Sequence, residues 1–175
     1  MAKQLTYGMV GGGPDAFIGA AHRKAIALDS SAKLVAGVFS RTAEKSRKMA
    51  ELLYLDKERC YGSYAEMAEK EAAREDGIDF VVVVTPNESH YDICKTFLQN
   101  GIHVACDKPV TVSYEQAREL EELAKEKGLL FMVTYTYTGY VTMKYARDAI
   151  RDGLIGDVRA VMAEYPQGWL AKEGD

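Results

Sequence analysis

An apolar run in the middle of the chain restricts the possible folds more than any other feature. The segment Asp79–Thr85 contains four consecutive valines, Val81–Val84. β-Branched residues favour strands, and a strand that lacks polar alternation is typical of a parallel sheet covered by helices on both faces. The run therefore predicts a buried central strand in an α/β protein.

Short β-rich segments alternate with longer segments of helical periodicity before and after this run. We expect strands at Leu5–Val10, Lys33–Phe39, around Tyr61, and at Asp79–Thr85, Ile102–Cys106 and Leu129–Thr134. We expect helices at Ile18–Leu28, after Thr42, after Ser63, and at Glu88–Asn100, Ser113–Lys127 and Tyr140–Arg151. Strands joined by helices of this length form a parallel sheet. The predicted fold class is α/β, a doubly wound parallel sheet with about six strands, as in dinucleotide-binding domains.

Polar residues and glycines mark the expected ends of the helices. Thr42, Ser63 and Ser113 precede helical patterns, and Ser63 with Glu66 has the spacing of a capping box. Glycines, which tolerate a left-handed backbone, follow three of the helices: Gly101, Gly128 and Gly153.

The pattern changes after Gly156. Val158–Tyr165 has the partial alternation of one more strand, and no further element follows it to cover its apolar face. We expect a dinucleotide-binding domain over residues 1–156 and the beginning of a truncated C-terminal domain over residues 157–175.

Charge and composition exclude several other classes of protein. The formal net charge is -4, whereas nucleic-acid-binding domains usually carry a basic excess. The longest apolar run, Phe80–Val84, is too short to span a membrane, and the N-terminus does not have the pattern of a signal peptide. Three widely spaced cysteines argue against a disulfide framework or a zinc site. We expect a cytoplasmic protein without a bound metal.

A glycine triplet follows the first expected strand. Gly11, Gly12 and Gly13 lie between that strand and an apolar helix, where a pyrophosphate meets backbone N–H groups at a helix N-terminus. Five residues separate the triplet from the next glycine, Gly19, whereas the usual fingerprint has a gap of about two residues. The triplet therefore predicts dinucleotide binding, and a plain tight turn is the alternative.

The end of the second expected strand bears on the choice of cofactor. An acidic residue at this position binds the ribose hydroxyls of NAD, but this chain has Ser40 and Arg41. A guanidinium pairs with the 2′-phosphate of NADP. The sequence favours NADP over NAD, and the alternative is a solvated arginine near a helix start.

Two later motifs carry a resemblance to a known family. The first is Thr85-Pro86-Asn87-Glu88-Ser89-His90, directly after the valine strand, and the second is Gly101-Ile102-His103-Val104-Ala105-Cys106-Asp107-Lys108-Pro109. Together with the glycine triplet, these motifs resemble the Gfo/Idh/MocA family of NAD(P)-dependent oxidoreductases. The resemblance implies a Rossmann domain followed by a C-terminal α/β domain that binds substrate and mediates oligomerisation. It also implies oxidation or reduction of hydroxyl and keto groups on sugars, inositols and related polyols.

The resemblance assigns expected roles to individual residues. Lys108 would be the catalytic lysine beside the reacting hydroxyl, and Pro109 would form a cis bond with it. Asp107 stands where the family has glutamate and would reach the nicotinamide ribose. The expected cofactor-binding residues, taken together, are Gly11, Gly12, Gly13, Phe17, Ile18, Ser40, Arg41, Thr85, Pro86, Asn87, His90, Asp107 and Lys108. A second acid/base group would come from the C-terminal domain.

The lysine fits the chemistry of hydride transfer. When hydride leaves a carbinol carbon, the hydroxyl proton must also leave, and a neighbouring ammonium stabilises the developing negative charge. Tyrosines that follow the last strand could recognise a polyol, so Tyr137, Tyr140 and Trp169 are expected near substrate or cofactor. His22 and His103 are interpreted as structural.

The leading hypothesis is therefore the cofactor-binding half of an NAD(P)-dependent dehydrogenase that forms a homo-oligomer at full length. The alternatives are a non-catalytic dinucleotide-binding or redox-sensing module and an inactive partner subunit. The sequence does not identify the substrate, because most of the residues that would select it belong to the C-terminal domain.

Overall fold

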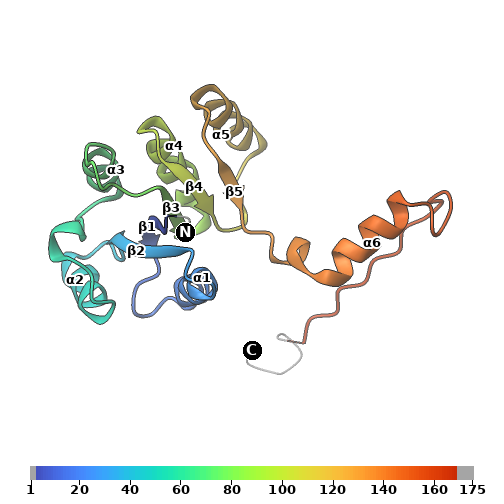
Figure 1. Cartoon of the computed structure of the whole chain (residues 1–175), viewed down its shortest axis with the longest axis horizontal. Helices are drawn as coiled ribbons and strands as arrows, with labels where there is room; N and C mark the ends of the chain where they lie inside the picture. Colours follow the sequence, from blue (N-terminus) through green and yellow to red (C-terminus); the bar gives the residue numbers. More distant parts are fainter. Residues whose placement is uncertain (1–2, 169–175) are drawn as a thin grey trace. The chain divides into compact units, whose positions relative to one another are not determined.

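The computed structural model describes residues 3–168. The chain forms two compact units, Met1–Thr134 and Tyr135–Asp175 (Figure 1). The predictions made for Trp169 and for the residues after it lie outside the described residues. The proposed domain boundary after residue 156 stays a prediction.

The first unit is built on a five-stranded sheet with the order β2-β1-β3-β4-β5, in which every neighbouring pair is parallel. The strands are β1 (Leu5–Gly11), β2 (Ala32–Val38), β3 (Phe80–Val84), β4 (His103–Cys106) and β5 (Phe131–Val133). The valine run forms β3 at the centre of the sheet, as predicted. The α/β fold class with a doubly wound parallel sheet is confirmed.

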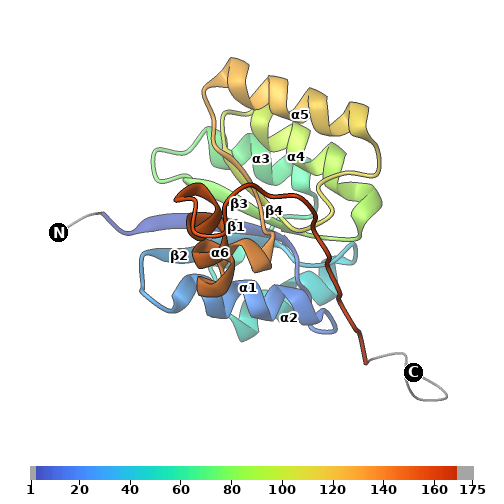
Figure 2. The same cartoon turned by 90° about the vertical axis from the view of Figure 1, so that its right-hand side faces the viewer.

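Helices cover both faces of this sheet (Figure 2). The helices α1 (Phe17–Ala27) and α2 (Ala43–Leu52) lie on one face, and α3 (Tyr64–Ala72), α4 (His90–Gln99) and α5 (Tyr114–Lys127) lie on the other (Figure 2). Two short 3₁₀ helices, η1 (Lys57–Arg59) and η2 (Asn87–Ser89), complete the unit.

The valines of β3 contribute to two separate cores. Val81 and Val83 pack in the cluster under α3, α4 and α5, whereas Val82 and Val84 pack in the cluster that includes residues of α1 and α2. Successive strand side chains point to opposite faces, so an unbroken apolar run is required where both faces are buried. The run of four valines is thus explained by the two helical layers.

The capping predictions have mixed outcomes. The Ser63 and Ser113 hydroxyls accept hydrogen bonds from Glu66 N and Gln116 N at 3.2 and 3.3 Å, so both caps are confirmed. The prediction that Thr42 caps α2 through its side chain is wrong. The Thr42 hydroxyl lies 3.3 Å from Ser40 Oγ, which offers it a nearer partner than the helix amides.

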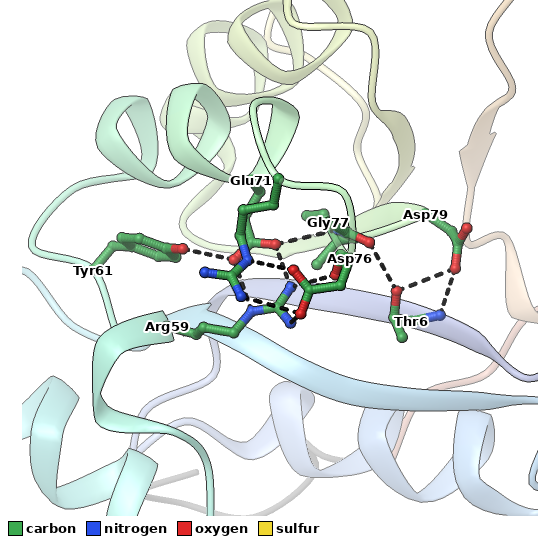
Figure 3. Close-up of polar contacts among 9 residues, drawn as sticks. Thr6, Arg59, Tyr61, Glu71, Asp76, Gly77 and Asp79 are labelled. Carbon is green, nitrogen blue, oxygen red and sulfur yellow. Dashed lines mark hydrogen bonds and ion pairs between the residues drawn. The ribbon is translucent and has the colours of Figure 1, made fainter.

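A buried polar network connects η1, α3 and the start of β3 (Figure 3). The Glu71 carboxylate accepts hydrogen bonds from Arg59 and from the Tyr61 hydroxyl, the latter at 2.6 Å, and the side chains of Arg59 and Glu71 are almost fully buried. Nearby, Asp79 Oδ2 accepts from Thr6 N at 2.6 Å. Because removing one partner of a buried ion pair leaves an uncompensated charge, this network stabilises the fold only as a complete set.

Two predicted strands are wrong. The segment around Tyr61 forms only an isolated bridge between Gly37 and Cys60, and the Tyr61 hydroxyl donates to Glu71. The segment Val158–Tyr165 has no regular secondary structure in the described part of the chain. A strand requires a backbone partner, and the described residues of the second unit include none paired with it.

The second unit contains η3 (Thr136–Gly139) and the helix α6 (Val141–Arg151). The Tyr137 ring meets Tyr140 edge-on at 5.5 Å between centroids, and it meets Tyr165 in the same way at 5.6 Å. The two tyrosines expected near substrate therefore contact each other within this unit. Among residues 3–168, no helix is long and apolar enough to cross a membrane.

Candidate functional site

A cleft of about 700 Å³ opens at the carboxyl ends of β1, β2 and β3 in the first unit. Its walls come from the glycine triplet, the residues after β2, the residues after β3 and the start of α3. In the sheet, β2 lies on one side of β1, and β3, which follows β2 in the chain, lies on the other side of β1. Open α/β sheets bind ligands at such a switch in strand order, so this cleft is the first candidate for a binding site.

The glycine triplet lies in backbone conformations that side chains rarely adopt. Gly11 and Gly12 have φ values of 92° and 70°. A Cβ at Gly11 would approach Val84 O at 2.6 Å, and a Cβ at Gly13 would approach Phe39 O at the same distance. The loop therefore depends on glycine both for its path and for its close approach to neighbouring strands.

Gly19 completes the glycine loop despite its displacement in the sequence. A Cβ at Gly19 would lie only 2.4 Å from Gly12 Cα, so α1 packs directly against the loop backbone. The third glycine of a dinucleotide fingerprint has this function in helix–strand packing. The extra residues before Gly19 lengthen the turn between the triplet and α1, and they do not remove the contact.

The N-terminus of α1 faces the loop without a side-chain cap. Its N-cap residue, Ala16, provides no side-chain hydrogen bond, so the first amides of the helix have no such partner. Arg23, from the same helix, donates from Nη1 to Gly12 O at 3.1 Å. Free helix amides and the helix dipole bind phosphate, and Arg23 fixes the loop that presents them. Arg23 was not identified from the sequence, where its only signal is its place one helical turn after Gly19.

Two cationic residues stand on the β2 side of the cleft. Arg41 lines the cleft and is exposed, and Lys45 from α2 lines it as well. Lys45 Nζ lies 3.3 Å from Asp15 Oδ2 in the loop before α1. The Ser40 hydroxyl accepts from Thr42 N at 3.2 Å and so shapes the turn that carries Arg41. Lys45 was not identified from the sequence, although it lies one helical turn beyond Arg41.

The residues after β3 form the opposite wall. Thr85 and Pro86 line the cleft, and Ser89 Oγ donates to Thr85 Oγ1 at 2.8 Å. Asn87 begins η2 and is exposed. The turn after β3 is thus held by its own side chains against the mouth of the cleft.

The second motif lies at the carboxyl end of β4. Asp107 Oδ1 accepts from Lys108 N at 2.9 Å and from Thr134 Oγ1 at 3.0 Å, and His22 Nε2 lies 3.9 Å from it. Burial lowers the pKa of His22, although the carboxylate opposes the shift. Lys108 is exposed, and its bond with Pro109 is cis, as expected. His22, interpreted as structural from the sequence, therefore contacts a predicted site residue.

His90 lies behind this wall. It is 1% exposed, and its ring nitrogens face two carbonyl oxygens, those of Pro109 and Thr85, at 2.7 and 2.9 Å. Burial alone would lower the pKa of His90, but its interactions with Cys106, Pro109 and Thr85 outweigh burial and raise it to about 9. The ring is fully engaged with the protein.

The cleft brings together only some of the predicted cofactor residues. It is lined by Gly11, Gly12, Gly13, Ser40, Arg41, Thr85 and Pro86. The lining does not include Phe17, Ile18, Asn87, His90, Asp107 or Lys108. Phe17 is exposed at the start of α1, and Ile18 packs against the core beneath that helix. Cofactor contacts for these residues, and substrate contacts for Tyr137 and Tyr140, stay predictions.

Comparison with known proteins agrees with the geometry of the cleft. Residues 5–135 match the oxidoreductase family with an NAD-binding Rossmann fold that is named Gfo/Idh/MocA. The chain belongs to this family. The resemblance carried by the Thr85-Pro86-Asn87 and Asp107-Lys108-Pro109 motifs is thereby confirmed.

Several relatives are similar over nearly the whole chain. The uncharacterized oxidoreductase YfiI of Bacillus subtilis is 39% identical over 99% of this chain and 44% of its own length. The crystal structure of an oxidoreductase from Sinorhizobium meliloti is 48% identical, with a TM-score of 0.92 over 99% of this chain and 48% of that one. An inositol dehydrogenase homolog from Azotobacter vinelandii, solved with NADH and myo-inositol, is 40% identical, with a TM-score of 0.87 over 90% of this chain and 42% of that one. The chain thus spans less than half the length of these relatives.

Proposed function

We propose that this chain is the cofactor-binding half of an enzyme that transfers hydride between a nicotinamide dinucleotide and a hydroxyl or keto group. The substrate class is a sugar, an inositol or a related polyol. The observation that carries the proposal is the glycine loop, which lines a cleft of about 700 Å³. Gly19 packs against this loop, and the N-terminus of α1 beside it has no side-chain cap. The Azotobacter relative, which binds NADH and myo-inositol, supports both the cofactor and the polyol.

Different residues of this chain bind different parts of the cofactor. The loop amides and the start of α1 hold the pyrophosphate, and Thr85 and Pro86 form the wall along which the rest of the dinucleotide lies. The bound nicotinamide supplies the hydride acceptor or donor. Asp107, oriented by Thr134 Oγ1 and Lys108 N, accepts hydrogen bonds from the nicotinamide ribose.

Lys108 acts on the substrate oxygen. Its ammonium donates to the substrate oxygen and stabilises the negative charge that develops there, in oxidation as the hydroxyl proton leaves and in reduction as hydride arrives. The hydrogen bond from Lys108 N to the Asp107 carboxylate fixes the backbone of Lys108 beside the carboxylate that is proposed to bind the ribose. The turn after β4 thus carries both the residue that orients the cofactor and the residue that binds the substrate oxygen. A second acid/base group comes from the C-terminal domain, which also completes the homo-oligomer.

The activity is tested directly with the full-length protein. NAD or NADP is offered with a panel of inositols, aldoses and simple polyols, and formation of reduced cofactor is followed by its absorbance. We expect reduction with at least one cyclic polyol or sugar. Tight cofactor binding without turnover on any member of the panel, in either direction, would favour the non-catalytic module instead.

The cofactor proposed is NADP, because Arg41 and Lys45 place two cations where the 2′-phosphate of the adenosine ribose would lie. Arg41→Ala is expected to weaken NADPH binding about tenfold, the loss of one charged hydrogen bond, and to change NADH binding less than about twofold. Fluorescence titration with both cofactors measures the difference. Arg47→Ala, an exposed arginine of α2 outside the cleft lining, is the matched control. Tighter binding of NADH by the unmodified protein would contradict the NADP assignment and agree with the Azotobacter relative.

A further inference from the structure

His90 connects the two sequence motifs of the proposed site from behind. It is the first residue of α4, and its ring lies between the turn after β3 and the turn after β4. Nδ1 is 2.7 Å from the carbonyl oxygen of Pro109, and Nε2 is 2.9 Å from that of Thr85. Those carbonyls belong to the segments that carry Lys108 and the Thr85–Pro86 wall of the cleft.

The two contacts determine the protonation of the ring. Each carbonyl oxygen can only accept a hydrogen bond, whereas a neutral imidazole has one N–H donor and one acceptor nitrogen. A neutral ring would place a nitrogen lone pair against a carbonyl lone pair at hydrogen-bonding distance in one of the two contacts. Only the imidazolium, with two N–H donors, satisfies both oxygens.

The surroundings of the ring favour the same state. The titratable groups that face it are thiols, Cys106 from β4 and, beyond it, Cys94 from α4. Hydrogen bonding with Cys94 holds the pKa of Cys106 below its usual value, and hydrogen bonding with Cys106 raises the pKa of Cys94. Both thiols are fully buried, and the Cys106 thiol donates to Asp107 O at 3.3 Å. The interaction of His90 with the Cys106 sulfur raises the pKa of His90.

We propose that His90 is a positioning residue, a buried imidazolium that clamps the Thr85 and Pro109 carbonyls and thereby sets the spacing of the two motifs. The clamp fixes the turn that carries Lys108 relative to the cleft wall, and the ring itself lies outside the lining of the cleft. Its relevance to catalysis rests on the proposed function. The clamp itself is a property of the fold and is tested without turnover.

The protonation state is tested by nitrogen NMR of the chain labelled with ¹⁵N-histidine. His90→Phe identifies the signals of this ring. We expect both ring nitrogens to have the shifts of protonated nitrogen from pH 6 to pH 8, whereas exposed imidazoles titrate near pH 6.5. A neutral ring with one unprotonated nitrogen at pH 7 would overturn the proposal.

The clamp is tested with variants that keep one contact at a time. An asparagine amide nitrogen occupies nearly the position of Nδ1, and a glutamine amide nitrogen nearly that of Nε2. His90→Gln keeps the Thr85 contact, so hydrogen exchange should accelerate about tenfold or more at the Lys108 amide and little at the Ser89 amide. His90→Asn should show the reverse pattern. His90→Phe, which fills the space without donors, should accelerate exchange at both amides.

His103→Gln is the matched control, because His103 begins β4 at the opposite end and accepts from Leu130 N at 3.0 Å. It should leave both reporter amides unchanged. Equal exchange patterns in the asparagine and glutamine variants, or normal exchange in the phenylalanine variant, would show that the ring only fills space and would overturn the clamp.

A last measurement separates this proposal from the proposed function. In the full-length protein, His90→Phe should weaken binding of the preferred cofactor, NADPH or NADH, about tenfold, and His103→Gln should change it by less than about twofold. Absence of both NADPH and NADH binding by the unmodified protein would refute the proposed function, and the exchange pattern would still decide the clamp. Normal cofactor binding and normal turnover by His90→Phe would refute its positioning role.

Discussion

Replacement of Lys108 by alanine is expected to reduce turnover by the full-length protein about 10³-fold, the usual contribution of a positioned acid/base group. The affinity for cofactor should change less than about threefold, because Lys108 lies outside the lining of the cleft in which the cofactor is proposed to bind. Turnover falls because the lysine stabilises charge that develops on the substrate oxygen only in the transition state. The effect of the substitution should therefore appear in kcat more than in the affinity for cofactor.

The measurement is steady-state turnover combined with fluorescence titration of the cofactor for the same preparation. Lys127→Ala is the control, because Lys127 is an exposed lysine at the end of α5 whose ammonium donates to Gln99 O. Its turnover should equal that of the unmodified protein. Full activity of the Lys108→Ala enzyme would show that the lysine takes no part in the chemistry. Such a result would leave the Rossmann fold and the family unchanged.

The layered architecture followed from the sequence because it depends on local patterns. Four adjacent valines required burial on both faces, and the alternation of strands with helices then required a parallel sheet. The two strand predictions that are wrong, around Tyr61 and at Val158–Tyr165, concern segments in which the pattern of apolar residues is typical of a strand. Pairing depends on a partner distant in the chain, and periodicity does not reveal whether a partner is present.

The interior of the candidate site was less predictable than its motifs. Lys45 contacts the loop before α1, Arg23 contacts the glycine triplet, and His22 contacts Asp107. All three residues lie on helices whose sequence patterns show only helical periodicity. The role of His90 was equally hidden. Its motif predicts a place beside the cofactor, and it does not predict that both ring nitrogens face backbone carbonyls. Sequence shows which residues are available, and tertiary packing decides what each one contacts.

Gly19 is the position where spacing in sequence and spacing in structure differ most clearly. The five residues between Gly13 and Gly19 depart from the fingerprint, but the contact between Gly19 and Gly12 preserves its packing. Gly19→Val should therefore force α1 away from the loop and weaken NADH and NADPH binding about 100-fold, since overpacking at a close backbone contact displaces the backbone itself. Intrinsic helix propensity would by itself make valine slightly better than glycine here, so a loss isolates the packing effect.

Fluorescence titration of both cofactors measures this loss, and thermal unfolding measures how far the substitution also destabilises the first unit. Ala21→Val, at an exposed position of the same helix, is the control and should bind both cofactors normally. The two cofactors should lose affinity equally, because the pyrophosphate is common to both and the 2′-phosphate is not involved. A Gly19→Val protein that retains normal affinity would show that the extended loop accommodates phosphate without the close approach of α1. A loss confined to NADPH would instead assign Gly19 to the adenosine side of the cleft.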